Sequence, residues 1–234
     1  MSEISSRIAI VDYGMGNLFN VKRACEYFGM HAAITSSYKE IESADAVILP
    51  GVGAFGDAMK NLEELNLVGL LQDTAAQNKP LVGICLGVQL LMEESLEFGT
   101  HKGLGIFKGR VVKFDHPMEG GRELKVPQVG WNRINKAKNP SRKDAWQGTL
   151  LEGIKDGVFM YFVHSYVVQP NDPEIIISTT KYGHIDFCSS LGRNNIFASQ
   201  FHPERSDIEG LKVYRNLASL IQHIQKEDYL DRKV

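Results

Sequence analysis

The sequence predicts an α/β fold: an open, mostly parallel, twisted sheet flanked by helices, with an antiparallel extension. Three observations predict it. Short apolar runs alternate with segments of helical periodicity in the first half, which is typical of a parallel sheet covered on both faces. The second half contains short strands separated by turn residues. No linker-like composition separates the halves, so we expect residues 1–234 to form a single domain.

Strands and helices alternate in the first half of the chain. Apolar and β-branched runs predict strands at Arg7–Asp12, His31–Thr35, Ala46–Leu49 and Leu81–Cys85. Apolar residues recur at helical spacing at Leu18, Val21, Cys25 and Phe28, through the segment Asp57–Asn78, and at Val88, Leu91 and Met92. This alternation predicts strands that run parallel, with a helix between successive strands.

The second half of the chain changes character. Short strands are expected at Gly109–Phe114, Val158–Val168, Ile175–Thr180, His184–Ser189 and Ile196–Gln200, and we expect them to extend the same sheet in antiparallel fashion. The polar, basic stretch Lys136–Gly148 predicts an exposed loop. A closing helix is indicated by Leu217, Leu220, Ile221 and Ile224, and the charged tail Lys226–Val234 is expected to fray.

Composition restricts the class of protein. Hydrophobic residues make up 43% of the chain and charged residues 23%, as in soluble globular domains. The net charge of −2 leaves no basic excess, so no nucleic-acid partner is expected. No apolar run approaches the roughly 18 residues that span a membrane, and the short polar segment Met1–Ser6 does not resemble a signal peptide. An odd count of three cysteines fits a reducing cytoplasm.

We expect neither a cofactor nor a metal site. Gly14 and Gly16 follow the first strand, but the third glycine of a dinucleotide fingerprint would fall at Phe19, so that pattern fails. No C-x-x-C or H-E-x-x-H spacing offers metal ligands.

A candidate nucleophile lies between a predicted strand and a predicted helix. Gly83-Ile84-Cys85-Leu86-Gly87 has the spacing of a nucleophile elbow, with cysteine in place of serine. Side chains at the two glycine positions would collide with neighbouring elements. The turn places Cys85 at a helix N-terminus, where free N–H groups favour a thiolate, and directs the Leu86 N–H toward an oxyanion. Cys25 and Cys188 lack such a context and are expected to pack in the core.

A thiolate nucleophile needs a general base, and the base needs a carboxylate that orients it. His202 and Glu204 follow an apolar strand and are two residues apart, so both side chains point to the same side of an extended segment. Pro203 restricts the backbone between them. We therefore expect Cys85, His202 and Glu204 to form a triad. His164 lies in an aromatic run and is expected to be structural.

A glycine-rich loop follows the third predicted strand, over Pro50–Gly56. Glycines beside a strand end reduce stability, but they let backbone N–H groups approach a ligand. The carboxyl edge of a parallel sheet is where α/β folds bind ligands. We therefore expect Gly53 to supply a second oxyanion donor, opposite Leu86.

Several motifs together resemble the class I (triad) glutamine amidotransferases, a family with a flavodoxin-like fold. Within that family the chain is most similar to the glutaminase subunits of imidazole glycerol phosphate synthases. The resemblance covers about Ile8 to Ile224, and its motifs are Asp12–Leu18 (DYGMGNL), Leu49–Gly56 (LPGVGAFG), Gly83–Leu91 (GICLGVQLL), Gly130–Asn132 (GWN), Tyr161–Tyr166 (YFVHSY) and Gln200–Glu204 (QFHPE).

The resemblance implies roles for matching residues. Cys85 would attack the carboxamide of glutamine, His202 would transfer the proton, and Glu204 would orient His202. The positions that match substrate-binding residues are Gly51, Gln89, Glu97, Ser165 and Tyr166. The positions that match residues facing a partner, a (β/α)8-barrel cyclase subunit that uses the ammonia, are Asn17, Trp131, Tyr161 and Arg205. No cofactor is implied.

The sequence leaves the ammonia acceptor open. Ser165 replaces a common threonine, Gln128 stands where histidine is frequent, and Lys136–Gly148 is longer than in compact members. These features resemble a paralogous branch in which the ammonia would amidate a surface-polysaccharide sugar instead of serving histidine biosynthesis. A cysteine peptidase and a non-catalytic relative are the remaining alternatives. A complete triad disfavours the non-catalytic relative, and PGVGAFG and YFVHSY argue against the peptidase.

Overall fold

The computed structural model describes residues 6–138 and 143–231. Five parallel strands form one end of a large mixed sheet: β2 (His31–Thr35), β1 (Arg7–Val11), β3 (Ala46–Gly51), β4 (Leu81–Cys85) and β16 (Ile196–Ser199), in that spatial order. This confirms the parallel first half, and it brings the strand before His202 directly beside the strand that ends in Cys85.

The sheet continues beyond β16 with mostly antiparallel strands. In spatial order they are β15 (Ile185–Arg193), β13 (Tyr166–Pro170), β7 (Phe107–Lys113), β5 (Met92–Ser95) and β6 (His101–Lys102), and β15 also pairs with β14 (Ile176–Tyr182), which pairs with β11 (Asn135–Lys136). One pair, β5 with β7, is parallel. The antiparallel extension is therefore confirmed.

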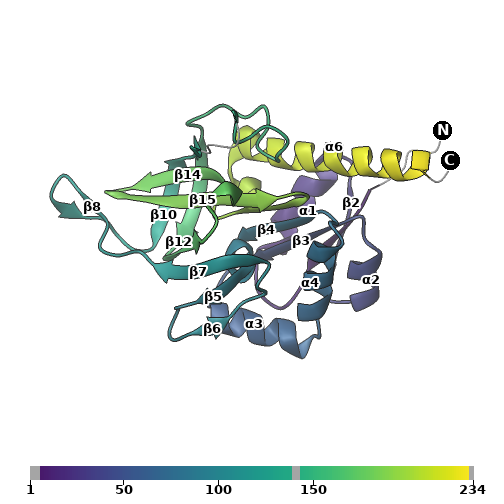
Figure 1. The fold of residues 1–234 in the computed structure, drawn as a ribbon, viewed down its shortest axis with the longest axis horizontal. Helices are drawn as coiled ribbons and strands as arrows, with labels where there is room; N and C mark the ends of the chain where they lie inside the picture. The colour runs from purple at the N-terminus through teal and green to yellow at the C-terminus, as the bar shows by residue number, and fades with distance from the viewer. Residues whose placement is uncertain (1–5, 139–142, 232–234) are drawn as a thin grey trace.

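Two small sheets stand apart from the large one. Strand β10 (Gln128–Arg133) pairs with β12 (Phe159–His164), and β8 (Met118–Glu119) pairs with β9 (Arg122–Glu123). Figure 1 shows β8 at the tip of an arm that projects from the body of the molecule. The expectation of one strand over Val158–Val168 in the same sheet is wrong. The strand is interrupted at Ser165, and the two resulting strands, β12 and β13, pair in different sheets.

Helices cover both faces of the large sheet (Figure 1). They are α1 (Leu18–Tyr27), α2 (Tyr38–Ser43), α3 (Phe55–Glu64), α4 (Val68–Ala76), α5 (Leu86–Leu90) and α6 (Asp207–Asp231), with single 3₁₀ turns at Pro173–Ile175 and Pro203–Arg205. Alternate residues of β1 point to opposite faces. Ile8 and Ile10 pack in one core with α1 and α6, and Ala9 and Val11 pack in a second core with α2 to α5.

Two helical segments differ from expectation. The segment Asp57–Asn78 is two helices, because Asn66 adopts a left-handed conformation (φ 57°) that ends α3 and redirects the chain into α4. The helix after Cys85 is one short turn that ends at Leu90. Met92 instead begins β5, where strand pairing with β7 takes the place of further helical turns.

The predicted exposed loop Lys136–Gly148 also needs correction. Ala145 and Trp146 are buried, and the Trp146 indole Nε1 donates a hydrogen bond to the Ile177 carbonyl at 3.0 Å. Residues 139–142 of this stretch lie outside the described residues. At the other end of the chain, α6 continues through the charged segment from Lys226 to Asp231.

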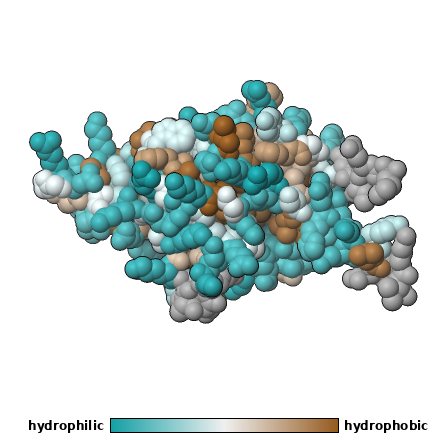
Figure 2. All heavy atoms as spheres, turned by 90° about the horizontal axis from the view of Figure 1, so that it is seen from above, coloured by the Kyte–Doolittle hydropathy of each residue, from teal (hydrophilic) through white to brown (hydrophobic). Residues whose placement is uncertain are grey.

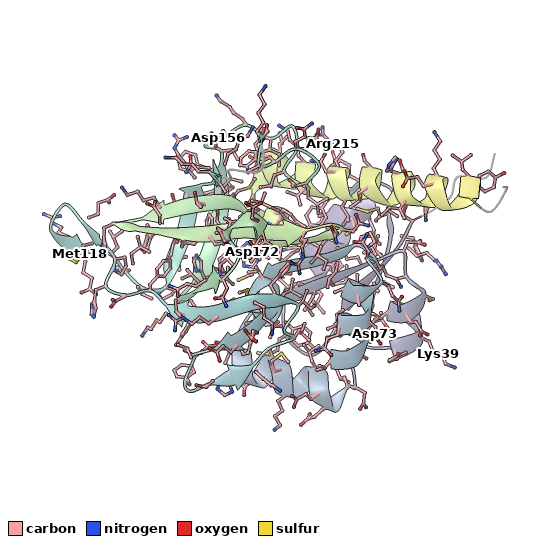
Figure 3. All side chains as sticks on the ribbon, in the orientation of Figure 1. Lys39, Asp73, Met118, Asp156, Asp172 and Arg215 are labelled. Atoms are coloured by element: carbon pink, nitrogen blue, oxygen red, sulfur yellow. The ribbon has the colours of Figure 1, made fainter. Side chains whose placement is uncertain are left out.

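The surface of the molecule is mainly hydrophilic. On the face shown in Figure 2, hydrophobic side chains gather near the middle among polar ones. In Figure 3, Lys39 on α2 and Asp73 on α4 lie on the same side of the molecule. Met118 lies at the other side, at the outer end of the arm that carries β8. Among the described residues, no helix combines the length and the apolar composition that crossing a bilayer requires.

Candidate active site

Cys85 occupies a strained turn between β4 and α5. Its backbone is left-handed (φ 55°, ψ −107°), a rare conformation for a residue other than glycine. A Cβ atom at Gly87 would overlap the carbonyl oxygen of Leu49, and one at Gly83 would lie 3.0 Å from the Gly87 carbonyl carbon. The two glycines are therefore required for close packing, which explains why the elbow has this sequence.

His202 and Glu204 form a buried pair beside the elbow. The His202 Nδ1 atom lies 2.7 Å from the Glu204 Oε1 atom, and the two side chains are 5% and 1% exposed. His202 has extended backbone dihedrals (φ −100°, ψ 96°), and Pro203 begins a 3₁₀ turn. The Ser206 hydroxyl donates a hydrogen bond to the His202 carbonyl at 2.6 Å. This segment therefore holds the imidazole ring in a single orientation.

The electrostatics of His202 depend on Cys85. Burial alone would lower the pKa of His202, but the negative charge of Cys85 and the hydrogen bond to Glu204 raise it to about 10. A charged imidazolium is therefore stable in this buried site. Among the described residues His202 Nε2 has no hydrogen-bond partner, so this nitrogen is free to accept or donate a proton.

A cleft of about 350 Å³ opens beside Cys85. Its lining residues are Val52, Gly53, Cys85, Leu86, Gln89, Glu97, Phe98, Lys113, Val163, His164, Ser165 and Tyr166. Both predicted oxyanion residues and four of the five predicted substrate-binding residues are in this set. The fifth, Gly51, lies at the end of β3 in register with Cys85, where a Cβ atom would overlap the Tyr13 hydroxyl.

Hydrogen bonds order the floor and wall of the cleft. Gln89 Nε2 donates to the Tyr166 carbonyl and to Gln200 Oε1, each at 3.1 Å. Gln200 Nε2 in turn lies 3.8 Å from the Cys85 sulfur. Glu97 Oε2 accepts a 2.6 Å hydrogen bond from the Phe55 N–H at the start of α3. These contacts hold Gln89 and Glu97 in place before any ligand arrives.

The glycine loop contributes Gly53 to the cleft. Gly53 has φ +114°, and a Cβ atom there would overlap the end of the Met15 side chain. Glycine is therefore needed at this position for its backbone conformation, since the flexible Met15 side chain could move away from an added methyl group. Tyr13 donates a hydrogen bond to the Pro50 carbonyl at 2.8 Å and so fixes the start of the loop.

His164 is buried among aromatic rings, in keeping with the structural role expected for it. Its Nδ1 atom is 2.9 Å from the Tyr166 carbonyl, and Phe114, Phe162 and Phe187 surround its ring. Burial lowers the pKa of His164 to about 4, so the ring is neutral near pH 7. Among the described residues, no cluster of three or more histidine, cysteine, aspartate or glutamate side chains is arranged to hold a metal ion.

The residues expected to face a partner lie next to the triad. The Trp131 and Tyr161 rings are 6.1 Å apart, the Arg205 guanidinium lies 4.2 Å from the Tyr161 ring centre, and Tyr161 and His202 are 6.4 Å apart. Trp131 is 52% exposed. Asn17 is exposed at the N-terminus of α1, which packs against the 3₁₀ turn that contains Arg205.

Sequence reasoning missed two residues of the site. Gln200 lies in the QFHPE motif, but the sequence alone indicates no role for it, although it connects Gln89 to Cys85. Its position immediately before the Phe201–Glu204 segment was the available signal. Lys113 lines the cleft from β7, and only the pairing of β7 with β13 brings it there.

Comparison with known proteins identifies the class. A family model described as glutamine amidotransferase class-I matches residues 9–217. The fold resembles PurLQS from Thermotoga maritima (TM-score 0.69, 16% identity, 93% of this chain and 100% of that chain). It also resembles a structure described as a glutamine amidotransferase (TM-score 0.66, 18% identity, 92% and 98%). The chain therefore belongs to the class-I glutamine amidotransferase family, and it is a glutamine amidotransferase enzyme.

Relatives with higher sequence identity define the group within the family to which the chain belongs. The chain is 46% identical over 211 residues to imidazole glycerol phosphate synthase subunit HisH of Aquifex aeolicus, covering 90% of this chain and 95% of the relative. It is 41% identical over 216 residues to the same subunit of Geobacter sulfurreducens, covering 92% and 99%. Within its family the chain thus groups with the HisH subunits of imidazole glycerol phosphate synthase.

Proposed function

We propose that the chain hydrolyses glutamine at Cys85 and passes the ammonia to a (β/α)8-barrel cyclase subunit for histidine biosynthesis. The observation that carries this proposal is the buried His202–Glu204 pair beside Cys85, at the edge of a cleft. The similarity to HisH subunits supports both a partner subunit and the histidine pathway.

The first half of the reaction releases ammonia. The Cys85 thiolate attacks the carboxamide carbon of glutamine, and the N–H groups of Gly53 and Leu86 stabilise the oxyanion that forms. His202 Nε2 donates its proton to the amide nitrogen, the carbon–nitrogen bond breaks, and ammonia leaves. A glutamyl thioester remains on Cys85.

The second half restores the enzyme. His202, now neutral, accepts a proton from water as the water oxygen attacks the thioester carbon. The carbon–sulfur bond breaks, which releases glutamate and returns the thiolate–imidazolium pair. Glu204 holds the imidazole in the tautomer that both steps need.

The cleft residues suit glutamine. Gln89, Glu97, Ser165 and Tyr166 line the cleft and present amide, carboxylate and hydroxyl groups. We propose that they hold the substrate.

Ammonia that escaped into water would be protonated and lost as a nucleophile, so direct transfer to a partner is chemically advantageous. The exposed Trp131, together with Tyr161, Arg205 and Asn17, is proposed to form the partner surface.

The Gly53 peptide is proposed to act as a gate. Glycine can rotate between backbone conformations that other residues avoid. A rotated peptide would leave the oxyanion site incomplete until the partner binds its own substrate, and this would prevent wasteful hydrolysis. If the chain alone hydrolysed glutamine as fast as the loaded complex, the gate would be wrong.

Two further proposals concern the whole chain. Cys85 follows a strand from the first half of the sequence and His202 follows a strand from the second. These two strands are adjacent in one sheet, which supports a single domain over residues 1–234.

The cysteines Cys25, Cys85 and Cys188 are free thiols. A nucleophile that must stay reduced supports function in the cytoplasm.

The decisive experiment measures glutamate release from glutamine by the chain alone and with a histidine-pathway cyclase subunit bound to its ribotide ligand. The Cys85→Ala variant is the blank. Strong stimulation by the loaded cyclase is expected. Absence of stimulation, with Cys85 still labelled by a reactive glutamine analogue, would indicate a glutaminase with another acceptor, such as a polysaccharide sugar. Absence of labelling would contradict glutaminase activity itself.

A further inference from the structure

The charges in the cleft are arranged in a way that the triad chemistry does not explain. Among the lining residues, Glu97 carries a carboxylate and Lys113 carries an ammonium group. His164, with its pKa lowered to about 4 by burial, is neutral near pH 7. Free glutamine is a zwitterion, with an α-ammonium and an α-carboxylate group. A site that selects free glutamine benefits from one group of each sign.

Strand pairing brings Lys113 to the cleft. Lys113 on β7 is in register with Tyr166 on β13, so the two side chains lie on the same face of the sheet. The next residue, Phe114, donates its N–H to the Ser165 carbonyl at 3.0 Å. Tyr166 also accepts, through its carbonyl, the hydrogen bond from Gln89. Lys113 therefore belongs to the same wall as three proposed substrate-binding residues.

Lys113 is available for a ligand. Its side chain is exposed, and within residues 6–138 and 143–231 no carboxylate lies within ion-pairing distance of its ammonium group. Glu97, by contrast, is buried, and one of its oxygens is bound to the Phe55 N–H. Burial and the nearby charge of Glu97 raise the pKa of the Tyr166 phenol, and strand register sets Tyr166 opposite Lys113.

We propose that Lys113 binds the α-carboxylate of glutamine while the second oxygen of Glu97 receives the α-ammonium group. This inference rests on the proposed glutaminase function and adds a residue that determines specificity. Lys113 would select free glutamine over amides that lack an α-carboxylate. It would act on substrate binding and not on the chemical step, because the reacting carboxamide lies at the Cys85 end of the substrate.

The test measures dissociation constants on the Cys85→Ala chain, which cannot turn over substrate. Three ligands are compared by calorimetry: glutamine, glutaramate, which lacks the α-ammonium group, and 4-aminobutanamide, which lacks the α-carboxylate. Lys113→Gln removes the charge, and Lys113→Arg retains it. Lys102→Gln is the matched control, because Lys102 is an exposed lysine on strand β6 that does not line the cleft.

Lys113→Gln is expected to weaken glutamine and glutaramate binding about tenfold and to leave 4-aminobutanamide unchanged. Lys113→Arg is expected to restore most of the affinity, and Lys102→Gln to match the parent. Added salt is expected to weaken glutamine binding to the parent more than to Lys113→Gln, because the pair is exposed.

Two results would overturn the inference. One is unchanged glutamine affinity in Lys113→Gln. The other is an equal loss for 4-aminobutanamide, which would indicate that the substitution distorts the cleft. Either result leaves the proposed function standing if the Cys85-intact chain hydrolyses glutamine with its partner. Failure of that hydrolysis would remove both the function and this inference.

Discussion

His202 Nδ1 and Glu204 Oε1 are 2.7 Å apart in a pair of side chains that are 5% and 1% exposed. Such close contact of buried groups fixes the ring orientation and leaves His202 Nε2 for Cys85. Because His202 is surrounded by the charges of both Cys85 and Glu204, its protonation reports the state of the whole triad.

Blocking Cys85 is expected to lower the pKa of His202. Without the thiolate, burial acts against the charged ring with one fewer compensating charge. The measurement is a titration of the His202 imidazole by NMR in the chain before and after alkylation of Cys85 with iodoacetamide. Alkylation of the Cys85→Ala variant is the control for reaction elsewhere. An unchanged His202 pKa would show that Cys85 and His202 do not interact.

Glu204→Gln is expected to lower kcat for glutamine hydrolysis on the order of 100-fold or more. The amide has nearly the shape of the carboxylate but no charge to stabilise the imidazolium. The pKa of His202 is expected to fall as well. Steady-state kinetics with the partner subunit check the first effect, with Glu174→Gln as a charge-matched control on the 3₁₀ turn Pro173–Ile175. A normal kcat in Glu204→Gln would exclude Glu204 from the triad.

Gly87→Ala is expected to destabilise the chain by about 3 kcal/mol or more, because the new methyl group would overlap the Leu49 carbonyl. Gly69→Ala is the matched control. Gly69 lies within α4, has space for a methyl group, and is expected to gain about 0.5–1 kcal/mol. Urea unfolding of both variants measures the difference. Equal stability of the two variants would contradict the tight packing of the elbow.

Acid is expected to destabilise the chain through His164. Its pKa is about 4 when folded and about 6.5 when unfolded, so between these values only the unfolded chain binds the proton. The stabilisation is therefore complete above pH 6.5 and is lost as pH falls toward 4. From pH 7 to pH 5 the loss is about 2 kcal/mol. His202, whose pKa is raised to about 10, contributes to pH dependence only above about pH 6.5.

The measurement is urea unfolding at both pH values for the parent and for His164→Gln. Glutamine retains a donor for the Tyr166 carbonyl but does not titrate in this range. The variant is expected to be less stable at pH 7 but to lose about 2 kcal/mol less than the parent on acidification. Equal losses in the two proteins would assign the acid sensitivity to other groups.

Trp131→Ala is expected to weaken binding to the cyclase subunit at least tenfold, since exposed aromatic residues at the centre of an interface often dominate affinity. Tyr27→Ala is the control. Tyr27 is 74% exposed but lies at the opposite end of α1 from Asn17. Titration of the complex by calorimetry gives both dissociation constants. Similar affinities for the two variants would place the partner surface elsewhere.

The elbow and the His202–Glu204 pair could be predicted because both depend on residues that are close in sequence. Gly83 and Gly87 each lie two positions from Cys85, and a single residue, Pro203, separates His202 from Glu204. The periodicity of local segments likewise indicated β1 to β4 and α1. Backbone geometry over a few residues decides these features, and the spacing of residues along the sequence indicates that geometry.

Contacts across strands could not be predicted in this way. Trp146 is buried in a stretch whose polar composition predicted exposure, because its indole reaches the Ile177 carbonyl 31 residues away. The sequence predicts one strand over Val158–Val168, yet its two halves pair in different sheets. In each case a distant partner outweighs the local pattern.

The amino-acid sequence was sufficient to predict the fold class and to propose Cys85, His202 and Glu204 as a triad, since short-range geometry specifies the elbow and the His202–Glu204 pair. Only the tertiary structure decided that Gln200 reaches Cys85 and that Lys113 stands beside Tyr166 in the cleft. The physical reason is strand register. Pairing between segments far apart in sequence selects which side chains share a face, and no local pattern encodes that choice.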